Sequence, residues 1–138
     1  MSAEIRYPFR PKSNRYLRPG QFWAIPLPDG RFGAGRVTAS PALGPSDRTG
    51  FCIGLMDWVG DAPPTAEDLS GCRVLGQAIT RWEAIASTGG EVLGSRALEL
   101  DGIVPIDPLD SRVGAKNTLW GWKTITAKAQ AVADRKEL

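Results

Sequence analysis

Short runs of apolar residues alternate along this chain with runs rich in Gly, Pro, Ser and Asp. Residues 21–27 indicate a strand that is apolar on both faces, with Trp23, Ile25 and Leu27 alternating against Phe22 and Ala24. Residues 31–38 return as a second strand, in which Arg31 and Arg36 are the charged residues. Between them, Pro28, Asp29 and Gly30 form a turn signal, because proline presets φ and glycine accepts the positive φ that other residues resist. The pattern predicts a β-hairpin.

The hairpin sequence also predicts structural roles for its proline and glycine residues. Pro26 has no N–H for a ladder hydrogen bond, so it marks an edge position or a strand end. Gly33 and Gly35 fall on one face of the second strand and leave that face nearly flat, which permits strand bending or the close approach of a backbone or an aromatic ring. Structural roles in the hairpin are assigned to Pro26, Asp29, Gly30, Gly33 and Gly35.

Three further strands are predicted beyond the hairpin. Residues 51–59 are apolar on both faces, which is typical of a central strand, and residues 72–79 form the next strand. Residues 118–126 are also β-rich and place Trp120 and Trp122 on one face, so that both enter or leave the core together.

Two helices complete the prediction. Thr80 and Glu83 have capping-box spacing ahead of a short helix that ends near residue 86, and the alanine-rich residues 127–138 predict a C-terminal helix. The expected fold is mainly β with minor α (α+β): a small, highly curved antiparallel sheet or SH3-like barrel of about five strands, with one short internal helix and a C-terminal helix. Residues 18–138 form this single β-rich domain, preceded by a basic, flexible N-terminal arm over residues 1–17.

The composition is that of one globular domain, with 42% hydrophobic and 23% charged residues in a chain of 138. No window approaches about 18 uninterrupted apolar residues, and the N-terminus lacks the apolar core of a secretory signal. We therefore expect a cytoplasmic protein without a membrane partner. In that compartment Cys52 and Cys72 are expected to be thiols rather than a disulfide.

The absence of histidine restricts the chemistry of this chain. It excludes Ser-His-Asp triads, Cys-His dyads and histidine-ligated zinc or iron. Neither cysteine belongs to a CxxC pair, and the carboxylate pairs lie in loops, where solvated charge is the simpler interpretation. No catalytic residue, metal site or cofactor is therefore predicted, and a hydrolase with a carboxylate-bound metal is the least favoured alternative.

The net charge of +2 is distributed unevenly, because five Arg or Lys residues and one Glu lie within residues 1–18. Tyr7, Phe9 and Tyr16 are interleaved with these charges. Such a segment suits phosphate binding and base stacking, which makes a nucleic-acid-associated small barrel the alternative function. The simpler interpretation is an extended and poorly ordered tail.

The five tryptophans are further candidates for contact with a partner. At least two or three of them are expected to fill the core, but Trp, Tyr and Arg also dominate the hot spots of protein interfaces. Arg31 and Arg36 lie on opposite faces of one strand, so at least one of them should reach solvent. The candidate partner-binding residues are Arg31, Arg36, Asp57, Trp58, Trp120 and Trp122.

Residues 18–37 resemble the N-terminal signature of the immunity protein 26 family of bacterial polymorphic toxin systems. That signature has basic-Pro-Gly-Asp, an aromatic residue and Ala-Ile-Pro-Leu, then Asp-Gly-Arg-aromatic and a small-residue stretch that ends in Gly-Arg-Val. Gln21 departs from the acidic residue of the signature, and Trp120-Gly121 is similar in placement to a later Trp-Gly pair. The matching residues are Pro19, Gly20, Phe22, Ala24, Ile25, Pro26, Leu27, Asp29, Gly30, Arg31, Gly35, Arg36 and Val37.

This resemblance implies a small, mostly β domain, SH3-like or barrel-like, that binds and neutralises a cognate toxin. Some members of the family are labelled phosphotriesterases, but the familiar enzymes of that activity use histidine-ligated metals, which a chain without histidine cannot form. The leading hypothesis is therefore a non-catalytic immunity protein whose partner is a protein toxin, with nucleic acid as the less favoured partner.

Overall fold

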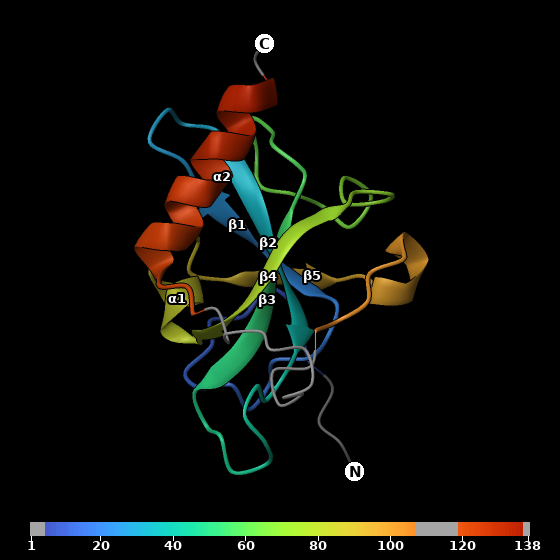
Figure 1. The fold of residues 1–138 in the computed structure, drawn as a ribbon, viewed down its shortest axis with the longest axis vertical. Coiled ribbons are helices and arrows are strands. Elements are labelled where there is room, and N and C mark those ends of the chain that lie inside the picture. Colours follow the sequence, from blue (N-terminus) through green and yellow to red (C-terminus); the bar gives the residue numbers. More distant parts are fainter. Residues whose placement is uncertain (1–4, 107–118, 137–138) are drawn as a thin grey trace.

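The computed structural model describes residues 5–106 and 119–136, which form one open antiparallel sheet with the strand order β4-β3-β2-β1-β5 (Figure 1). The elements are β1 (Gln21–Pro26), β2 (Phe32–Ala39), β3 (Gly50–Met56), β4 (Val74–Arg81), α1 (Glu83–Ala86), β5 (Val92–Ser95), the 3-10 helix η1 (Leu98–Asp101) and α2 (Trp122–Lys136). The predicted class, mainly β with minor α, is confirmed. Of the two forms that the sequence allowed, the open curved sheet is the one found.

The predicted β-hairpin is confirmed, with β1 and β2 antiparallel and Phe22 opposite Arg36 in the register. Gly30 has φ +89° and donates its N–H to the carbonyl of Leu27 at 3.0 Å, which closes the turn. Pro26 is the last residue of β1 and is exposed, so its missing N–H leaves no gap in the ladder.

The flat glycine face of β2 is covered by an aromatic ring and by a helix. A Cβ atom at position 35 would lie 2.5 Å from Cζ2 of Trp23, and one at position 33 would lie 3.0 Å from Cβ of Ala129 in α2. The two glycines therefore let the Trp23 indole and α2 approach the sheet closely.

Each face of the sheet has its own hydrophobic cluster. The larger cluster lies under α1 and α2 and contains Trp23, Phe51 and Ile125, while the smaller one lies under η1 and contains Phe22 and Met56. Every residue of β3 is buried, because β3 lies between β2 and β4 and is covered on both faces. The prediction of an interior strand is confirmed.

The strand predicted over residues 118–126 is wrong. Thr118 lies outside the described residues, Leu119 makes an isolated parallel bridge with Ile79, and α2 begins at Trp122. A helix forms from Trp122 in place of the strand because the buried residues recur at helical spacing. The burial of that helix face outweighs the β-propensity of the Trp and Thr side chains. Those buried residues are Ile125, Ala129, Val132 and Ala133.

The predicted helix cap at Thr80 is also wrong. Thr80 belongs to β4, where it lies opposite Phe51 in the ladder with β3. The short helix α1 begins only at Glu83, and its N-cap position is occupied by Trp82 without a side-chain cap. Pairing with an interior strand therefore outweighs the local capping signal.

The segment before Arg18 contacts the domain along most of its described length. Phe9 exchanges backbone hydrogen bonds with Val92 at 3.1 and 2.8 Å, and Leu17 is fully buried in the larger cluster. The side-chain amide of Asn14 donates to the carbonyl groups of Asp47 and Gly50 at 2.9 and 2.8 Å. These contacts do not support a flexible arm over residues 5–17; residues 1–4 lie outside the described part.

Among the described residues, no helix has the length and apolar character required to cross a membrane.

Candidate functional site

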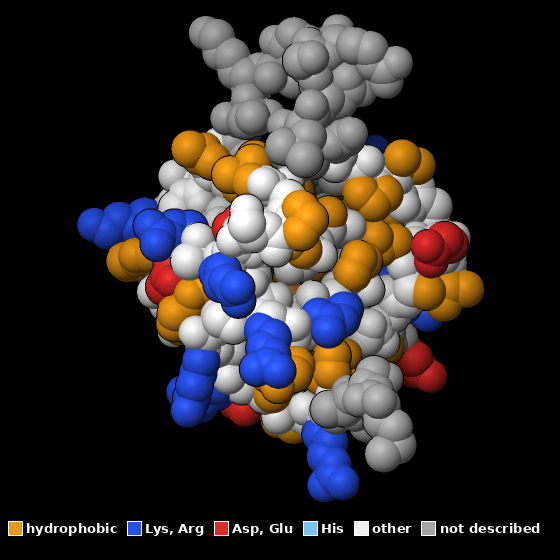
Figure 2. Space-filling model, turned by 90° about the horizontal axis from the view of Figure 1, so that it is seen from below, with side chains coloured by type: hydrophobic (Ala, Val, Ile, Leu, Met, Phe, Trp, Pro, Cys, Tyr) orange, Lys and Arg blue, Asp and Glu red, His pale blue; other side chains and the backbone are white. Residues whose placement is uncertain are grey.

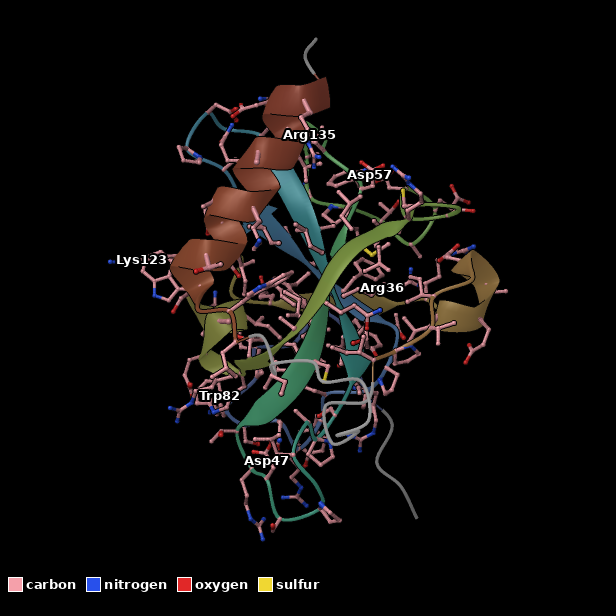
Figure 3. The ribbon with its side chains drawn as sticks, in the orientation of Figure 1. Arg36, Asp47, Asp57, Trp82, Lys123 and Arg135 are labelled. Carbon is pink, nitrogen blue, oxygen red and sulfur yellow. The ribbon has the colours of Figure 1, made fainter. Side chains whose placement is uncertain are left out.

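Arg36 is buried and ties β2 to η1, so it cannot contact a partner. Its side chain, labelled in Figure 3, is 0% exposed. Its Nη1 lies 2.8 Å from Oδ2 of Asp101. Its Nη2 donates to the carbonyl groups of Arg96 and Ala97. The prediction of Arg36 as a contact residue is not supported, because its side chain is buried and both terminal nitrogens bond inside the domain, although its buried Nε has no hydrogen-bond partner.

Asp101 is the centre of this buried network. Arg96 Nε donates to Oδ2 at 2.9 Å, and the backbone N–H of Gly71 donates to Oδ1 at 2.9 Å. Burial by itself raises the pKa of Asp101, but the hydrogen bonds from Arg96, Gly71 and Arg36 outweigh it and lower that pKa from 3.8 to about 2. The carboxylate is therefore ionised and structural.

Arg31 lies at the turn between β1 and β2, where it forms an ion pair with Asp29 at 2.6 Å. The side-chain and backbone hydrogen bonds from Arg31, together with one from Gln130 of α2, hold the pKa of Asp29 well below its usual value. The turn is thus linked to α2 by hydrogen bonds among polar side chains.

Asp57 and Trp58 follow the end of β3. Asp57 lies in the upper right of Figure 3, away from Lys123 at the start of α2. Asp57 pairs with Arg73 at 3.2 Å, and the indole of Trp58 packs over Gly60, which is bridged to Phe32. The structure therefore does not bring the six predicted contact residues together. It separates them into a buried network, a turn, a strand end and the start of α2 with the residues just before it.

Trp120 and Trp122 line one apolar groove, where α2 meets β4 and α1. This groove has a volume of about 560 Å³. Trp120 is 8% exposed and Trp122 is 44% exposed, so the prediction that they enter or leave the core together is wrong. The groove is lined by Leu43, Asp47, Thr49, Gly50, Ile79, Thr80, Arg81, Glu83, Ala84, Leu119, Trp120, Gly121 and Trp122.

Trp120 is fixed in place as the inner wall of the groove. Its backbone N–H donates to the carbonyl of Ile79 at 3.0 Å, and the Lys128 ammonium lies 5.1 Å from its ring centroid. A Cβ atom at Gly76 would lie 3.0 Å from the ring. The indole is therefore held between β4 and α2, in a fixed orientation.

Three exposed large side chains gather at the groove. Leu43, Leu119 and Trp122 are 50%, 72% and 44% exposed. Trp122 also lines a second hollow, with Pro28 and Ala127 among its other walls, so its ring stands between two depressions. Apolar side chains that cluster in this way on a surface mark a site of interaction.

The polar groups of the groove are engaged with one another or with the backbone. Arg81 and Glu83 form an ion pair at 3.2 Å. Burial tends to raise the pKa of Asp47, but N–H groups of Gly50, Thr49 and Leu43 donate to this carboxylate and keep its pKa below the usual value. The groove thus combines an apolar centre with a charged rim, as protein interfaces do.

Sequence reasoning missed Leu43 and Leu119 as members of this site. Both are apolar residues outside the regular strands, and such a position is the available signal, because a large apolar side chain in a loop often remains exposed. Cys52 is buried beside Ala42 and Ile79, whereas the thiol of Cys72 donates to the carbonyl of Asp68 at 3.4 Å, so the two cysteines lie in different clusters.

The described residues contain no group of three or more His, Cys, Asp or Glu side chains that could hold a metal ion. No protein-family model, no curated protein and no solved structure matches this chain.

Proposed function

We propose that this protein is a non-catalytic binding protein that neutralises a cognate bacterial toxin, and that the apolar groove beside Trp122 receives the toxin. The observation that carries the proposal is the gathering of Leu43, Leu119 and Trp122 around one groove. Exposed tryptophan in a hollow with a charged rim is the usual arrangement of an interface hot spot.

The choice of a toxin as partner rests on the resemblance of residues 18–37 to the immunity protein 26 signature. In this chain the signature residues Gly30 and Gly35 close the hairpin and admit Trp23, so they support the fold rather than the groove. The signature thus supports the choice of a toxin as partner, while the groove supports the choice of the surface that contacts it.

The carboxylates at the groove already bond to other groups of this chain, which supports binding rather than catalysis. Asp47 and Glu83 lie at the groove, but the first accepts backbone hydrogen bonds and the second pairs with Arg81. The pKa of Asp47 is lowered, so its carboxyl group is ionised near neutral pH and does not have the proton that a general acid donates.

The test is protection of bacterial cells against the toxin encoded beside this gene. Co-expression of the wild-type protein restores growth, and the purified pair co-elutes in size-exclusion chromatography. Trp122→Glu abolishes both effects, since it places a charge in the apolar centre. The matched control is Leu100→Glu, which alters another exposed apolar residue, on η1.

The proposal fails if the protein protects against no neighbouring toxin. The groove assignment alone fails if Trp122→Glu protects and binds as well as Leu100→Glu.

A further inference from the structure

A second surface, which differs from the groove in chemistry but shares Asp47 with it, lies where the N-terminal segment meets the loop before β3. Asn14 fixes this junction, because its amide donates to the carbonyl groups of Asp47 and Gly50 and its backbone N–H donates to the carbonyl of Arg48 at 3.4 Å. Residues 13–15 therefore lie against the loop of residues 41–50. Figure 2 views this end of the molecule and shows Lys and Arg side chains spread across it, with few Asp or Glu side chains between them.

Arg15 and Arg48 lie in this junction, and the exposed cations Lys12 and Arg18 are close to them in the chain. Together with Tyr16 we call these four cations the basic face. Arg15 and Arg48 line a hollow of about 560 Å³. Arg18 Nη1 donates to the carbonyl groups of Arg15 and Leu17 at 2.7 and 2.9 Å, which holds its guanidinium beside Arg15. The cations are thus presented on an ordered backbone.

These charges are not fully neutralised by the carboxylates nearby. Within the described part of the chain, no ion pair involves Lys12, Arg15, Arg18 or Arg48. Asp47 lines the hollow as an ionised carboxylate that accepts hydrogen bonds from Leu43, Thr49 and Gly50, so it offsets one of the four positive charges. The remaining positive charge favours a polyanionic ligand.

An aromatic ring stands among the cations. Tyr16 is 44% exposed, and the guanidinium of Arg15 lies 5.3 Å from its ring centroid. An exposed ring beside a guanidinium offers a stacking surface for a base, while the neighbouring cations offer contacts for phosphates. An acidic protein segment would use the cations but has no need of the ring.

We propose that the basic face binds single-stranded nucleic acid, with phosphates on Lys12, Arg15, Arg18 and Arg48 and a base stacked on Tyr16. Bases that are splayed out in a single strand can reach such a ring, whereas bases in a duplex are already stacked on each other. The binding is electrostatic in its larger part and therefore weakens as salt increases.

The experiment measures fluorescence anisotropy of a labelled oligouridine of about 12 nucleotides against the full-length protein over a series of salt concentrations. The test variant is Lys12→Gln/Arg15→Gln/Arg48→Gln. The control is Arg73→Gln/Lys128→Gln/Arg135→Gln, which removes the same net charge from exposed positions elsewhere. Circular dichroism establishes that both variants fold.

The test variant is expected to lose about tenfold or more in affinity and to reduce the salt slope by about 2, since each lost phosphate contact contributes about 0.7. The control changes the affinity much less. Absence of binding by the wild-type protein, or equal losses in the two variants, overturns the proposal.

Tyr16→Ala separates nucleic acid from other polyanions. It is expected to weaken oligouridine binding about fivefold or more, because one stacked base is lost. If Tyr16→Ala has no effect, and polyglutamate or a duplex of the same charge displaces the oligouridine with equal strength, the surface is a general acidic-ligand or duplex site and the proposal is wrong.

Discussion

Arg36 and Asp101 form an ion pair at 2.8 Å although they are 65 residues apart, and both side chains are fully buried. The pair joins an interior strand to η1, which covers the smaller hydrophobic cluster. Two desolvated charges are stable there because Asp101 also accepts hydrogen bonds from Arg96 and Gly71, and Arg36 also donates to two carbonyl groups.

Arg36→Met should strongly destabilise the protein. It leaves the Asp101 carboxylate buried with fewer partners and two carbonyl groups without their donor, so we expect a loss of about 3 kcal/mol or more in the free energy of unfolding. Urea-induced unfolding measures this change. The matched variant Arg31→Met breaks a partly exposed pair and should cost less than about 1 kcal/mol. Equal losses in the two variants would contradict the buried network.

Acid should weaken the fold through Asp101. Its folded-state pKa, about 2, lies below the ordinary value of 3.8, so its stabilising contribution is complete above about pH 4 and is lost as the pH falls towards 2. The loss amounts to about 2 kcal/mol over that window. Asp29 and Asp47, whose pKa values are also lowered, add to the decrease with the same sign.

The contribution of Asp101 is isolated by comparing Asp101→Asn with the wild type in urea titrations across pH 2–5. The variant is less stable at pH 5, and its stability should depend less on pH between about 4 and 2. Asp61→Asn, which alters an exposed carboxylate outside the network, serves as the control. If the free energy of unfolding of Asp101→Asn falls with pH as steeply as that of the wild type, the stabilising role given to the ionised Asp101 is wrong.

The hairpin could be predicted from the sequence because its information is local. Pro28, Asp29 and Gly30 specify the turn within three residues, and the two-residue period specifies the strands on either side. The pairing of Arg36 with Asp101 could not be predicted, since no local pattern links positions so far apart. An arginine within a strand whose other residues are apolar or small is the only available sign of a buried partner.

The region before α2 was mispredicted because two signals compete there. The Trp and Thr side chains of residues 118–126 favour a strand, whereas the apolar positions from Ile125 onward recur at helical spacing. The shape of the groove depends on where α2 begins. A strand would place Trp120 and Trp122 on one face, whereas the start of the helix at Trp122 leaves Trp120 buried and Trp122 exposed. The site was therefore only partly predictable: its aromatic residues were named, but their different burial was not.

Gly35→Ala should destabilise the protein by overpacking. The added methyl group would lie 2.5 Å from the indole of Trp23, which is fully buried and held by a hydrogen bond from Nε1 to Oγ1 of Thr88 at 3.0 Å. Because the ring cannot move away, we expect a loss of about 1–3 kcal/mol in urea-induced unfolding. Gly121→Ala is the control, since a methyl group there would meet no atom within 4 Å apart from those of its two neighbours in the chain. A neutral Gly35→Ala would show that Trp23 does not pack on β2.

Substitution of Trp120 should reduce the stability of the fold, whereas substitution of Trp122 should reduce binding. Trp120→Ala removes a buried ring that contacts β4 and carries Lys128 above it, so we expect a loss of about 3–5 kcal/mol in the free energy of unfolding. Trp122→Ala removes an exposed ring and should change that free energy by less than about 1 kcal/mol.

The same Trp122→Ala variant should bind the cognate toxin at least about 30-fold more weakly, as expected of a hot-spot tryptophan. Thermal unfolding and isothermal titration calorimetry measure the two effects. A large loss of stability in Trp122→Ala would mean that its ring supports the fold instead of presenting a surface.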